Sequence, residues 1–322
     1  TVHEESRFAR KNYFYPDLPK GYQISQYEEP LATKGYVEVP LHDGTSKRFA
    51  LTRIHMEEDA GKSIHAEGGT LIDLNRAGTP LIEIVGEPEL RGAEEAAEYL
   101  RALHAVLRYL GVCSGDMEKG EFRCDANVSI RPLGRAKLGT RVEIKNLNSF
   151  RHVQKAIEYE IARQADVLDS GGAIVQETRL WNPDKNFTAP MRGKEDAHDY
   201  RYFPDPDLPP LIVSKELIEA QRAKLPSLPM ERREIYLREH GLSPADAAVI
   251  IADRAVAEFF EALVAFGTPA KTAANWTMGE VLRVMNKDAL EAPPLTAERL
   301  FGLLDAVEKK VVSQSAAKKV FE

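Results

Sequence analysis

Two neighbouring segments, in which polar and apolar residues strictly alternate, constrain the fold of this chain more than any other feature of its sequence. Between Phe122 and Ile130 every second residue is apolar or small, and the residues between them are polar. A glycine-containing loop leads to residues 140–146, where Val142 and Ile144 alternate with charged residues. Because successive side chains of a strand point to opposite faces, both segments are predicted to be half-buried strands. We expect an antiparallel hairpin with one apolar and one polar face.

Helices are predicted on both sides of this hairpin. Apolar residues recur at helical spacing over 93–110, and Gly111 is placed to end that helix. A second helix is expected over 150–168, with Ser149 as its N-cap and Gly171 just beyond its end. Before the first helix, residues 69–85 are expected to form two short strands around an Asn-Arg-Ala-Gly turn.

The second half of the chain changes to a helical pattern after a proline-rich connector at residues 205–211. Helix starts are expected at Ser214 and at Ser243. The fold class is therefore predicted as α+β, an antiparallel-sheet domain followed by an all-α region. Amphipathic helices are expected over 247–266, 270–285 and 296–307.

The composition of the chain limits the classes of function that it can have. The chain of 322 residues carries 43 Lys or Arg and 50 Asp or Glu, a formal net charge of −7, which argues against a generic nucleic-acid binder such as a DNA-binding protein. Residues 116–155 are the exception, with nine basic residues against five acids, and this local excess suits a polyanion such as ATP or an RNA end. The two cysteines, Cys113 and Cys124, are too few for a disulfide framework or a four-cysteine zinc site.

No apolar run approaches the roughly 18 residues that a membrane span requires, so a cytoplasmic protein is predicted.

The polar face of the predicted hairpin is the main candidate site. Carboxylate and amide oxygens are ligands that Mg²⁺ prefers, and Arg and Lys side chains suit phosphate oxygens. A solvated sheet face with cross-strand ion pairs explains the same pattern, and the residues alone leave both interpretations open. The candidates on or next to this face are Glu118, Arg123, Asp125, Asn127, Arg141, Glu143 and Lys145.

Three further segments carry polar or aromatic clusters. The run His55–Lys62 (HMEEDAGK) is interpreted as an acidic loop and is weak as a metal cluster, because its spacing fits no P-loop or zinc helix. His198 is a candidate base, although a lone loop histidine is more often a solvated side chain. The aromatic residues of Lys11–Tyr27 suit either base stacking or ordinary core and turn packing.

Six long segments resemble, in order along the chain, the B subunit of the bacterial-type tRNA-dependent amidotransferases. The resemblance covers almost the whole chain and is weakest after about residue 214. The segments are Lys11–Tyr27, Arg53–Ser63 (RIHMEEDAGKS), Asp73–Val85 (DLNRAGTPLIEIV), Met117–Ser129 (MEKGEFRCDANVS), Glu143–Phe150 (EIKNLNSF) and Met191–Leu211 (MRGKEDAHDYRYFPDPDLPPL).

The resemblance implies a ligase with three subunits. The B subunit would phosphorylate the misacylated residue of Glu-tRNAGln or Asp-tRNAAsn with ATP and Mg²⁺, and then form the amide. An amidase A subunit would release ammonia from glutamine, and a small C subunit would hold the two together. The implied organisation is a cradle domain over residues 1–211, a helical domain over 212–292 and the start of a helical tail over 293–322.

The resemblance also suggests roles for individual residues. Glu118 and Glu143 look like the family's magnesium-ligating carboxylates. From chemistry alone we add Arg123, Arg141 and Lys145 for phosphate oxygens. Asp125 and Asn127 are added for positioning the metal or the substrate, with Asp125 and Lys145 also counted as catalytic. The family's Gly-Leu-Glu-Val-His segment is not found here, and a chain shortened at both ends is expected.

Three alternatives remain open at this point. The related archaeal-type E subunit shares the cradle but has a large inserted domain, whereas here Leu211 is soon followed by a predicted helix. A non-catalytic tRNA-binding scaffold would keep the fold without the chemistry. An unrelated ATP-dependent carboxylate–amine ligase would not require aminoacylated tRNA.

Overall fold

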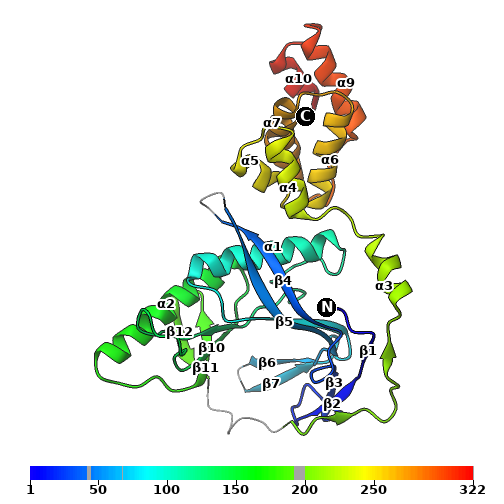
Figure 1. The fold of residues 1–322 in the computed structure, drawn as a ribbon. Helices are drawn as coiled ribbons and strands as arrows, with labels where there is room; N and C mark the ends of the chain where they lie inside the picture. The colour runs from blue at the N-terminus through cyan, green and yellow to red at the C-terminus, as the bar shows by residue number, and fades with distance from the viewer. Residues whose placement is uncertain (42–44, 67, 192–199, 322) are drawn as a thin grey trace. The chain divides into compact units, whose positions relative to one another are not determined.

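The chain forms two compact units, seen in a computed structural model that describes residues 1–41, 45–66, 68–191 and 200–321 (Figure 1). The first unit carries the β-sheets, and the second is mainly helical. The first unit comprises Thr1–Val39, Lys47–Tyr99 and Cys124–Lys224, and the second comprises Pro40–Ser46, Leu100–Arg123 and Leu225–Glu322.

A six-stranded sheet dominates the first unit. Its strand order is β13-β2-β3-β5-β4, and β8 also pairs with β5. The long strand β5 is central because it pairs antiparallel with both β3 and β8. Phe49 and Leu51 of β5 are buried, and Phe49 packs edge-on against Tyr99. The strands are β2 (Ala9–Asn12), β3 (Tyr22–Ser25), β4 (Ala32–Pro40), β5 (Ser46–Glu58), β8 (Pro80–Gly86) and β13 (Phe203–Pro204).

The predicted hairpin forms the edge of a second, four-stranded sheet of order β12-β11-β10-β9. The antiparallel pairing of β9 with β10 is confirmed, with Val142 opposite Val128, and both side chains are buried. The regular strand is shorter than the alternation predicted. In addition, β10 pairs in parallel with β11, which pattern along the chain cannot reveal. The strands are β9 (Ala126–Val128), β10 (Val142–Lys145), β11 (Glu177–Asn182) and β12 (Phe187–Pro190).

Two short two-stranded sheets complete the first unit. The strands expected within residues 69–85 are present as β7 (Gly69–Asp73) and β8, but they do not pair with each other. Instead, β7 pairs with β6 (Lys62–Ala66), and β8 joins β5. In the other sheet, β1 (Glu5–Ser6) pairs antiparallel with β14 (Leu211–Ile212).

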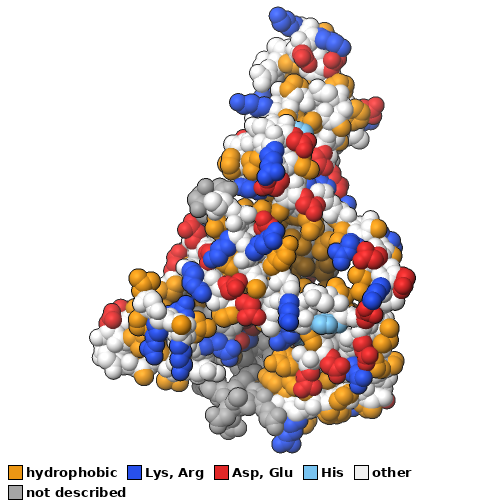
Figure 2. All heavy atoms as spheres, viewed as in Figure 1, with side chains coloured by type: hydrophobic (Ala, Val, Ile, Leu, Met, Phe, Trp, Pro, Cys, Tyr) orange, Lys and Arg blue, Asp and Glu red, His pale blue; other side chains and the backbone are white. Residues whose placement is uncertain are grey.

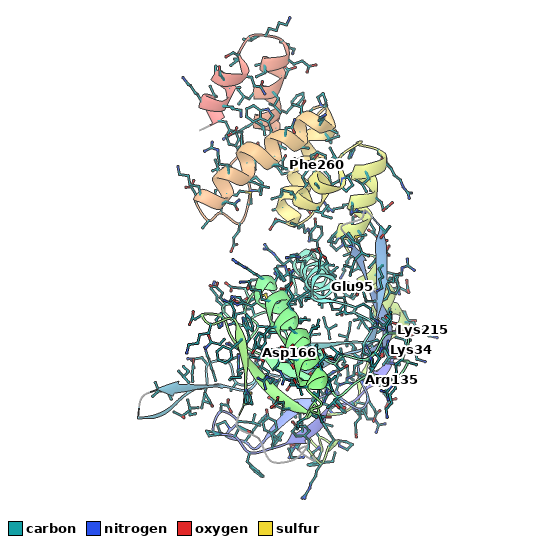
Figure 3. The ribbon with its side chains drawn as sticks, turned by 90° about the vertical axis from the view of Figure 1, so that its left-hand side faces the viewer. Lys34, Glu95, Arg135, Asp166, Lys215 and Phe260 are labelled. Carbon is teal, nitrogen blue, oxygen red and sulfur yellow. The ribbon has the colours of Figure 1, made fainter. Side chains whose placement is uncertain are left out.

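Both predicted helices of the first half are confirmed. α1 (Ala93–Tyr109) is followed by Gly111, which adopts φ 67° in the left-handed region, as a glycine just past a helix C-terminus should. α2 (Phe150–Asp169, marked by Asp166 in Figure 3) begins at Ser149, whose side chain accepts a hydrogen bond from the backbone N–H of His152 at 3.1 Å.

α2 packs on the four-stranded sheet through a polar network. Glu160 is completely buried and accepts hydrogen bonds from Arg163, Gln164 and Thr188. The same Gln164 also donates to the backbone carbonyl of Val128 at 3.1 Å. The network therefore joins the helix to both edge strands, β9 and β12.

The second unit contains a helical core that includes the buried side chains of Tyr236, Phe260 (labelled in Figure 3) and Trp276. The expected single helix over 247–266 is wrong, because Asp253 accepts hydrogen bonds from the backbone N–H groups of Ala255 and Val256 and starts a new helix there. The other helix starts and helices are confirmed. The helices after β14 are α3 (Lys215–Arg222), α4 (Pro229–Arg238), α5 (Pro244–Ile250), α6 (Arg254–Ala265), α7 (Ala270–Trp276), a π-helical turn (Thr277–Val281), α8 (Leu282–Lys287), α9 (Ala297–Glu308) and α10 (Gln314–Phe321).

The α+β fold class is thus confirmed, with antiparallel sheets followed by a helical region. Among the described helices, none has the length and apolar character needed to cross a membrane.

Candidate functional site

Strand β10 brings three of the predicted site residues together. Lys145 Nζ lies 2.6 Å from Asp125 Oδ2 and 3.4 Å from Glu143 Oε1. The other oxygen of Glu143 accepts a hydrogen bond of 2.8 Å from the hydroxyl of Thr178 on β11. Thr178 was missed by the sequence analysis because it lies opposite Glu143 only through the unexpected parallel pairing.

This arrangement keeps Lys145 charged. Burial alone would lower the pKa of Lys145, but the attraction of Asp125 and Glu143 outweighs it, and the pKa is raised above the ordinary lysine value. Lys145 can therefore present positive charge but cannot serve as a proton acceptor near neutral pH. A cationic group of this kind suits phosphoryl oxygens.

The remaining predicted site residues are distributed over the two units. Asn127 and Arg141 are exposed, and Asn127 is opposite Glu143 in the β9–β10 register. Glu118 and Arg123 belong to the second unit, where both are exposed and the Glu118 backbone N–H is held by Asp116 at 2.9 Å. Their roles stay predictions.

A second polar cluster lies on the six-stranded sheet. His55 and Glu57 belong to strand β5 rather than to a loop, which corrects the interpretation of the HMEEDAGK run. Glu83 on β8 is directly opposite His55 in the antiparallel register. One ligand atom from each of these three residues lies within 4.8 Å of the others, and His55 and Glu57 are buried.

This cluster was not predicted from the sequence because its polar side is the buried one. Residues two apart on a strand share a face, so Arg53, His55 and Glu57 point to the same side of β5. The alternation of polar and apolar residues in this part of β5 is the sequence signal that could have identified the cluster. The pairing with Glu83, 28 positions after His55, was not readable without the strand register.

Two glutamines hold the backbone on either side of Glu57. The side-chain oxygen of Gln26 accepts from the N–H of Met56 at 3.1 Å, and its amide donates to Ser6. Gln23 donates to the carbonyl of Glu58 at 2.6 Å. Both glutamines are almost completely buried, so these hydrogen bonds fix the strand segment that carries Glu57.

The cluster is chemically suited to a hard divalent cation. Burial alone would raise the pKa of Glu57, but His55 and Lys11 outweigh it and hold the pKa below the ordinary glutamate value. Glu57 is therefore ionised near neutral pH. Two carboxylates, Glu57 and Glu83, supply oxygen ligands of the type that Mg²⁺ binds, so the residues fit that ion.

Lys11 and Tyr200 connect the two clusters electrostatically. The Lys11 ammonium lies 5.1 Å from the centre of the Tyr200 ring and also influences Glu57. Burial raises the pKa of Tyr200, with Lys145 and Glu143 acting on the same phenol in opposite directions. The two clusters therefore belong to one polar region of the first unit.

The aromatic segment Lys11–Tyr27 mostly packs against the protein itself. Tyr13 contacts Tyr15 and Tyr200 edge-on, and its hydroxyl donates to Gln23. Phe14 is the exception, with 90% of its surface exposed. His198 lies outside the described residues.

Cys124 is not a nucleophile in this arrangement. Burial, assisted by the charge of Asp125, raises the pKa of the Cys124 thiol to about 12.

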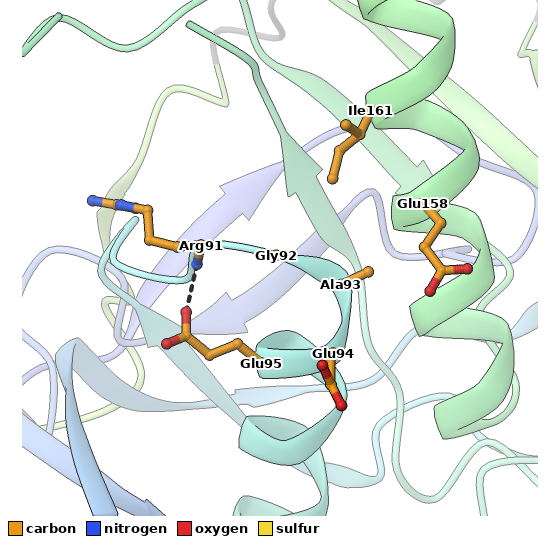
Figure 4. Close-up of a pocket in the computed structure, with 7 residues that line it drawn as sticks. All are labelled: Arg91, Gly92, Ala93, Glu94, Glu95, Glu158 and Ile161. Atoms are coloured by element: carbon orange, nitrogen blue, oxygen red, sulfur yellow. Dashed lines mark hydrogen bonds between the residues drawn. The ribbon is translucent and has the colours of Figure 1, made fainter. Parts of the chain in front are cut away.

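The hollows on the described part of the first unit include one beside the start of α1 and one beside the end of β5. The larger, of about 530 Å³, is lined by the first turn of α1 and by Glu158 and Ile161 of α2 (Figure 4). Its carboxylate Glu95 is already engaged by Lys47 and by the Arg91 backbone N–H, and it holds none of the predicted site residues. The smaller, of about 250 Å³, is lined in part by Lys20, Glu58 and Asp59, directly after Glu57 in the chain.

The face shown in Figure 2 carries no large patch of a single charge sign. Lys and Arg side chains are intermixed with Asp and Glu side chains over the face shown in Figure 2. Recognition of a polyanion on this face would therefore depend on local groups rather than on a broad basic surface.

The chain matches two families of known proteins. The GatB/GatE catalytic domain family matches residues 1–219, which include both clusters on the sheets, and the GatB domain family matches residues 258–322. The match over residues 1–219 places the chain in the GatB/GatE class of proteins, with the α+β fold described above.

Individual relatives define the family more closely. The B subunit of aspartyl/glutamyl-tRNA(Asn/Gln) amidotransferase from Solidesulfovibrio magneticus is 57% identical over 324 aligned residues, which cover 99% of this chain and 68% of the relative. The proteins of the same name from Geobacter sulfurreducens and Pseudomonas syringae pv. syringae are 56% and 53% identical, over 67% and 68% of their lengths. The chain belongs to the family of aspartyl/glutamyl-tRNA(Asn/Gln) amidotransferase B subunits.

Proposed function

We propose that this chain carries out the ATP-dependent amidation of Glu-tRNAGln, Asp-tRNAAsn or both. The observation that carries the proposal is the pair of neighbouring carboxylates Glu57 and Glu83 on the six-stranded sheet of a chain from this family. Ammonia would come from an amidase A subunit, and a small C subunit would join the two in a cytoplasmic heterotrimer.

The proposed reaction has two steps. In the first, a carboxylate oxygen of the tRNA-linked residue attacks the γ-phosphorus of ATP, and ADP leaves. In the second, the ammonia nitrogen attacks the acyl carbon of the resulting acyl phosphate, inorganic phosphate leaves, and a proton is released. Phosphoryl transfer of this kind depends mainly on positioning and charge neutralisation.

Different residues of the polar region have different proposed roles in this reaction. Glu57 and Glu83 would hold Mg²⁺, which neutralises charge on the phosphate oxygens of ATP. Lys145 presents a permanent positive charge to the transferred phosphoryl group, held in place by Asp125 and Glu143.

The residues taken from the resemblance and from chemistry complete the proposal. Glu118 and Glu143 are each proposed as magnesium-binding carboxylates, while Arg123 and Arg141 would contact phosphate oxygens and Asn127 the substrate. Thr178 fixes the orientation of Glu143 through its hydroxyl.

The test is ATP consumption by this chain together with its partner subunits, ammonia and misacylated tRNA. Wild type is compared with Glu57→Gln, Glu143→Gln and the exposed control Glu158→Gln, which lies on α2. We expect tRNA-dependent ATP consumption in wild type and control. A loss in both Glu57→Gln and Glu143→Gln supports the proposed site.

The possible contrary outcomes are distinct. Consumption that is unaffected at Glu57 and Glu143 would place the chemistry elsewhere. No consumption in wild type, with tRNA still bound, would favour the non-catalytic scaffold.

A further inference from the structure

The role of His55 in the carboxylate cluster depends on which of its ring nitrogens carries the proton. His55 lies on β5 between Arg53 and Glu57, all on one face of the strand, with Glu83 opposite on β8. Its Nε2 faces the two carboxylates, 3.6 Å from Glu57 Oε2 and 3.9 Å from Glu83 Oε2. A histidine in this place can bind a cation through a lone pair, or present an N–H to the carboxylates.

The other ring nitrogen decides between these roles. Arg53 Nε donates a hydrogen bond to His55 Nδ1 at a distance of 3.4 Å. A guanidinium has no acceptor atom, so Nδ1 must offer its lone pair and cannot carry a proton. The proton of the ring is then on Nε2, which faces Glu57 and Glu83 and has no lone pair left for a cation.

Arg53 is held in the position that this requires. Its guanidinium lies 4.3 Å from the centre of the Tyr27 ring. Tyr27 is stacked on Tyr202, with ring centroids 4.9 Å apart and planes 9° apart, and meets His55 edge-on at 6.2 Å. Arg53 and His55 are therefore oriented by the same aromatic ring.

Nε2 lies close to two carboxylates but makes no hydrogen bond to them. Nε2 is buried, and no described atom lies within hydrogen-bonding distance of it. A buried N–H without a partner is costly, and the nearest acceptors are the two carboxylates, a few tenths of an ångström beyond that distance. A small movement of Glu57 or Glu83 toward the ring satisfies it.

We infer that Arg53 fixes His55 as the tautomer protonated on Nε2, so that His55 orients Glu57 and Glu83 rather than binding the cation. His55 and Arg53 are then positioning residues, and the cation is bound by carboxylates alone on this side. This deepens the proposed function and rests on it only for the presence of a cation.

The first experiment determines the tautomer without any metal. The whole chain is labelled with ¹⁵N-histidine, and two-bond ¹H–¹⁵N correlation spectra distinguish the two tautomers; the His55 signals are identified by their loss in His55→Gln. The test variant is Arg53→Met. The matched control is Arg48→Met, because Arg48 also lies on β5 and over a tyrosine ring, 4.5 Å from the centre of Tyr36.

We expect the Nε2–H pattern for His55 in wild type and in Arg48→Met, and a shift toward the Nδ1–H pattern in Arg53→Met. An Nδ1–H pattern in wild type, or an unchanged His55 in Arg53→Met, overturns the inference.

The second experiment uses Mn²⁺ as the probe. Spin-echo spectra of the Mn²⁺-bound, ¹⁵N-histidine-labelled chain reveal any imidazole nitrogen bonded directly to the ion. We expect Mn²⁺ binding that is lost in Glu57→Gln, with no directly bonded histidine nitrogen at this site. A bonded nitrogen that disappears in His55→Gln overturns the inference, whereas Mn²⁺ binding unaffected by Glu57→Gln refutes the proposed metal site and leaves the tautomer result standing.

Discussion

The buried carboxylate of Glu160 is expected to contribute a large share of the stability of the first unit. It accepts four hydrogen bonds, two from Arg163 at 3.0 and 2.6 Å, one from Gln164 at 2.9 Å and one from Thr188 at 3.2 Å. Replacing Glu160 by Leu leaves these donors without this acceptor and removes the carboxylate that lies 3.7 Å from Arg179. Removing one partner of a buried ion pair costs about 3–5 kcal/mol, and we expect that range here because Arg163 can regain only part of its hydration.

The assay is urea unfolding followed by the fluorescence of Trp181, which is buried in β11. The chain has two tryptophans, so a Trp276→Phe background makes Trp181 the reporter of the first unit. Glu158→Gln is the control, since Glu158 is exposed on the same helix, and a change within about 0.5 kcal/mol is expected for it. A Glu160→Leu variant as stable as this control would refute the reasoning.

The same network predicts a dependence of stability on pH. Burial alone would raise the pKa of Glu160, but Arg163 and Gln164 outweigh it and hold the pKa below the ordinary value of 4.5. A depressed carboxyl pKa stabilises the folded state above the unfolded-state pKa, and this stabilisation is lost as the pH falls through the folded-state value. The stability difference between wild type and Glu160→Gln should therefore shrink below about pH 4.5.

Three further substitutions test other parts of the first unit. Ser149→Ala removes the N-cap of α2 and should cost about 1 kcal/mol in the same unfolding assay. Gly61→Ala should destabilise by at least about 1 kcal/mol, because the new Cβ would lie 2.8 Å from the Asp73 carbonyl oxygen and 2.9 Å from that of Asp17. Thr178→Val should lower kcat for amide formation about tenfold, the equivalent of one hydrogen bond of about 1.4 kcal/mol, while Thr178→Ser retains activity. Equal rates for the two Thr178 variants would contradict the role of its hydroxyl.

Local chemistry explains what could be predicted from the sequence. The alternation around Val128 and Val142 predicted the β9–β10 pair because those two strands are close in the chain. Ser149 and Gly111 marked helix ends correctly, since capping depends on the residue at the end itself. Asp253 follows the same rule, because it caps the start of a new helix although periodicity alone predicted one continuous helix over 247–266.

What could not be predicted depends on contacts between distant segments. Thr178 reaches Glu143 only through a parallel pairing of β10 with β11, and Glu83 reaches His55 only through the β5–β8 register. The polar face of β5 also reverses the usual rule that the buried side of a strand is apolar, so the His55 run was interpreted as a loop. Residues that violate a local rule in this way are often those of a functional site.

The central claim is that this chain activates a tRNA-linked carboxylate as an acyl phosphate, using the carboxylates of its first unit. Hydroxylamine trapping tests it most directly, because hydroxylamine displaces phosphate from the acyl phosphate and gives a side-chain hydroxamate, which differs from the α-hydroxamate formed by cleavage of the aminoacyl ester. With ATP, misacylated tRNA and the partner subunits but no ammonia, we predict hydroxamate in wild type and almost none in Glu57→Gln. Equal side-chain hydroxamate in both would contradict the account, as would no hydroxamate from a wild type that forms amide when ammonia is supplied.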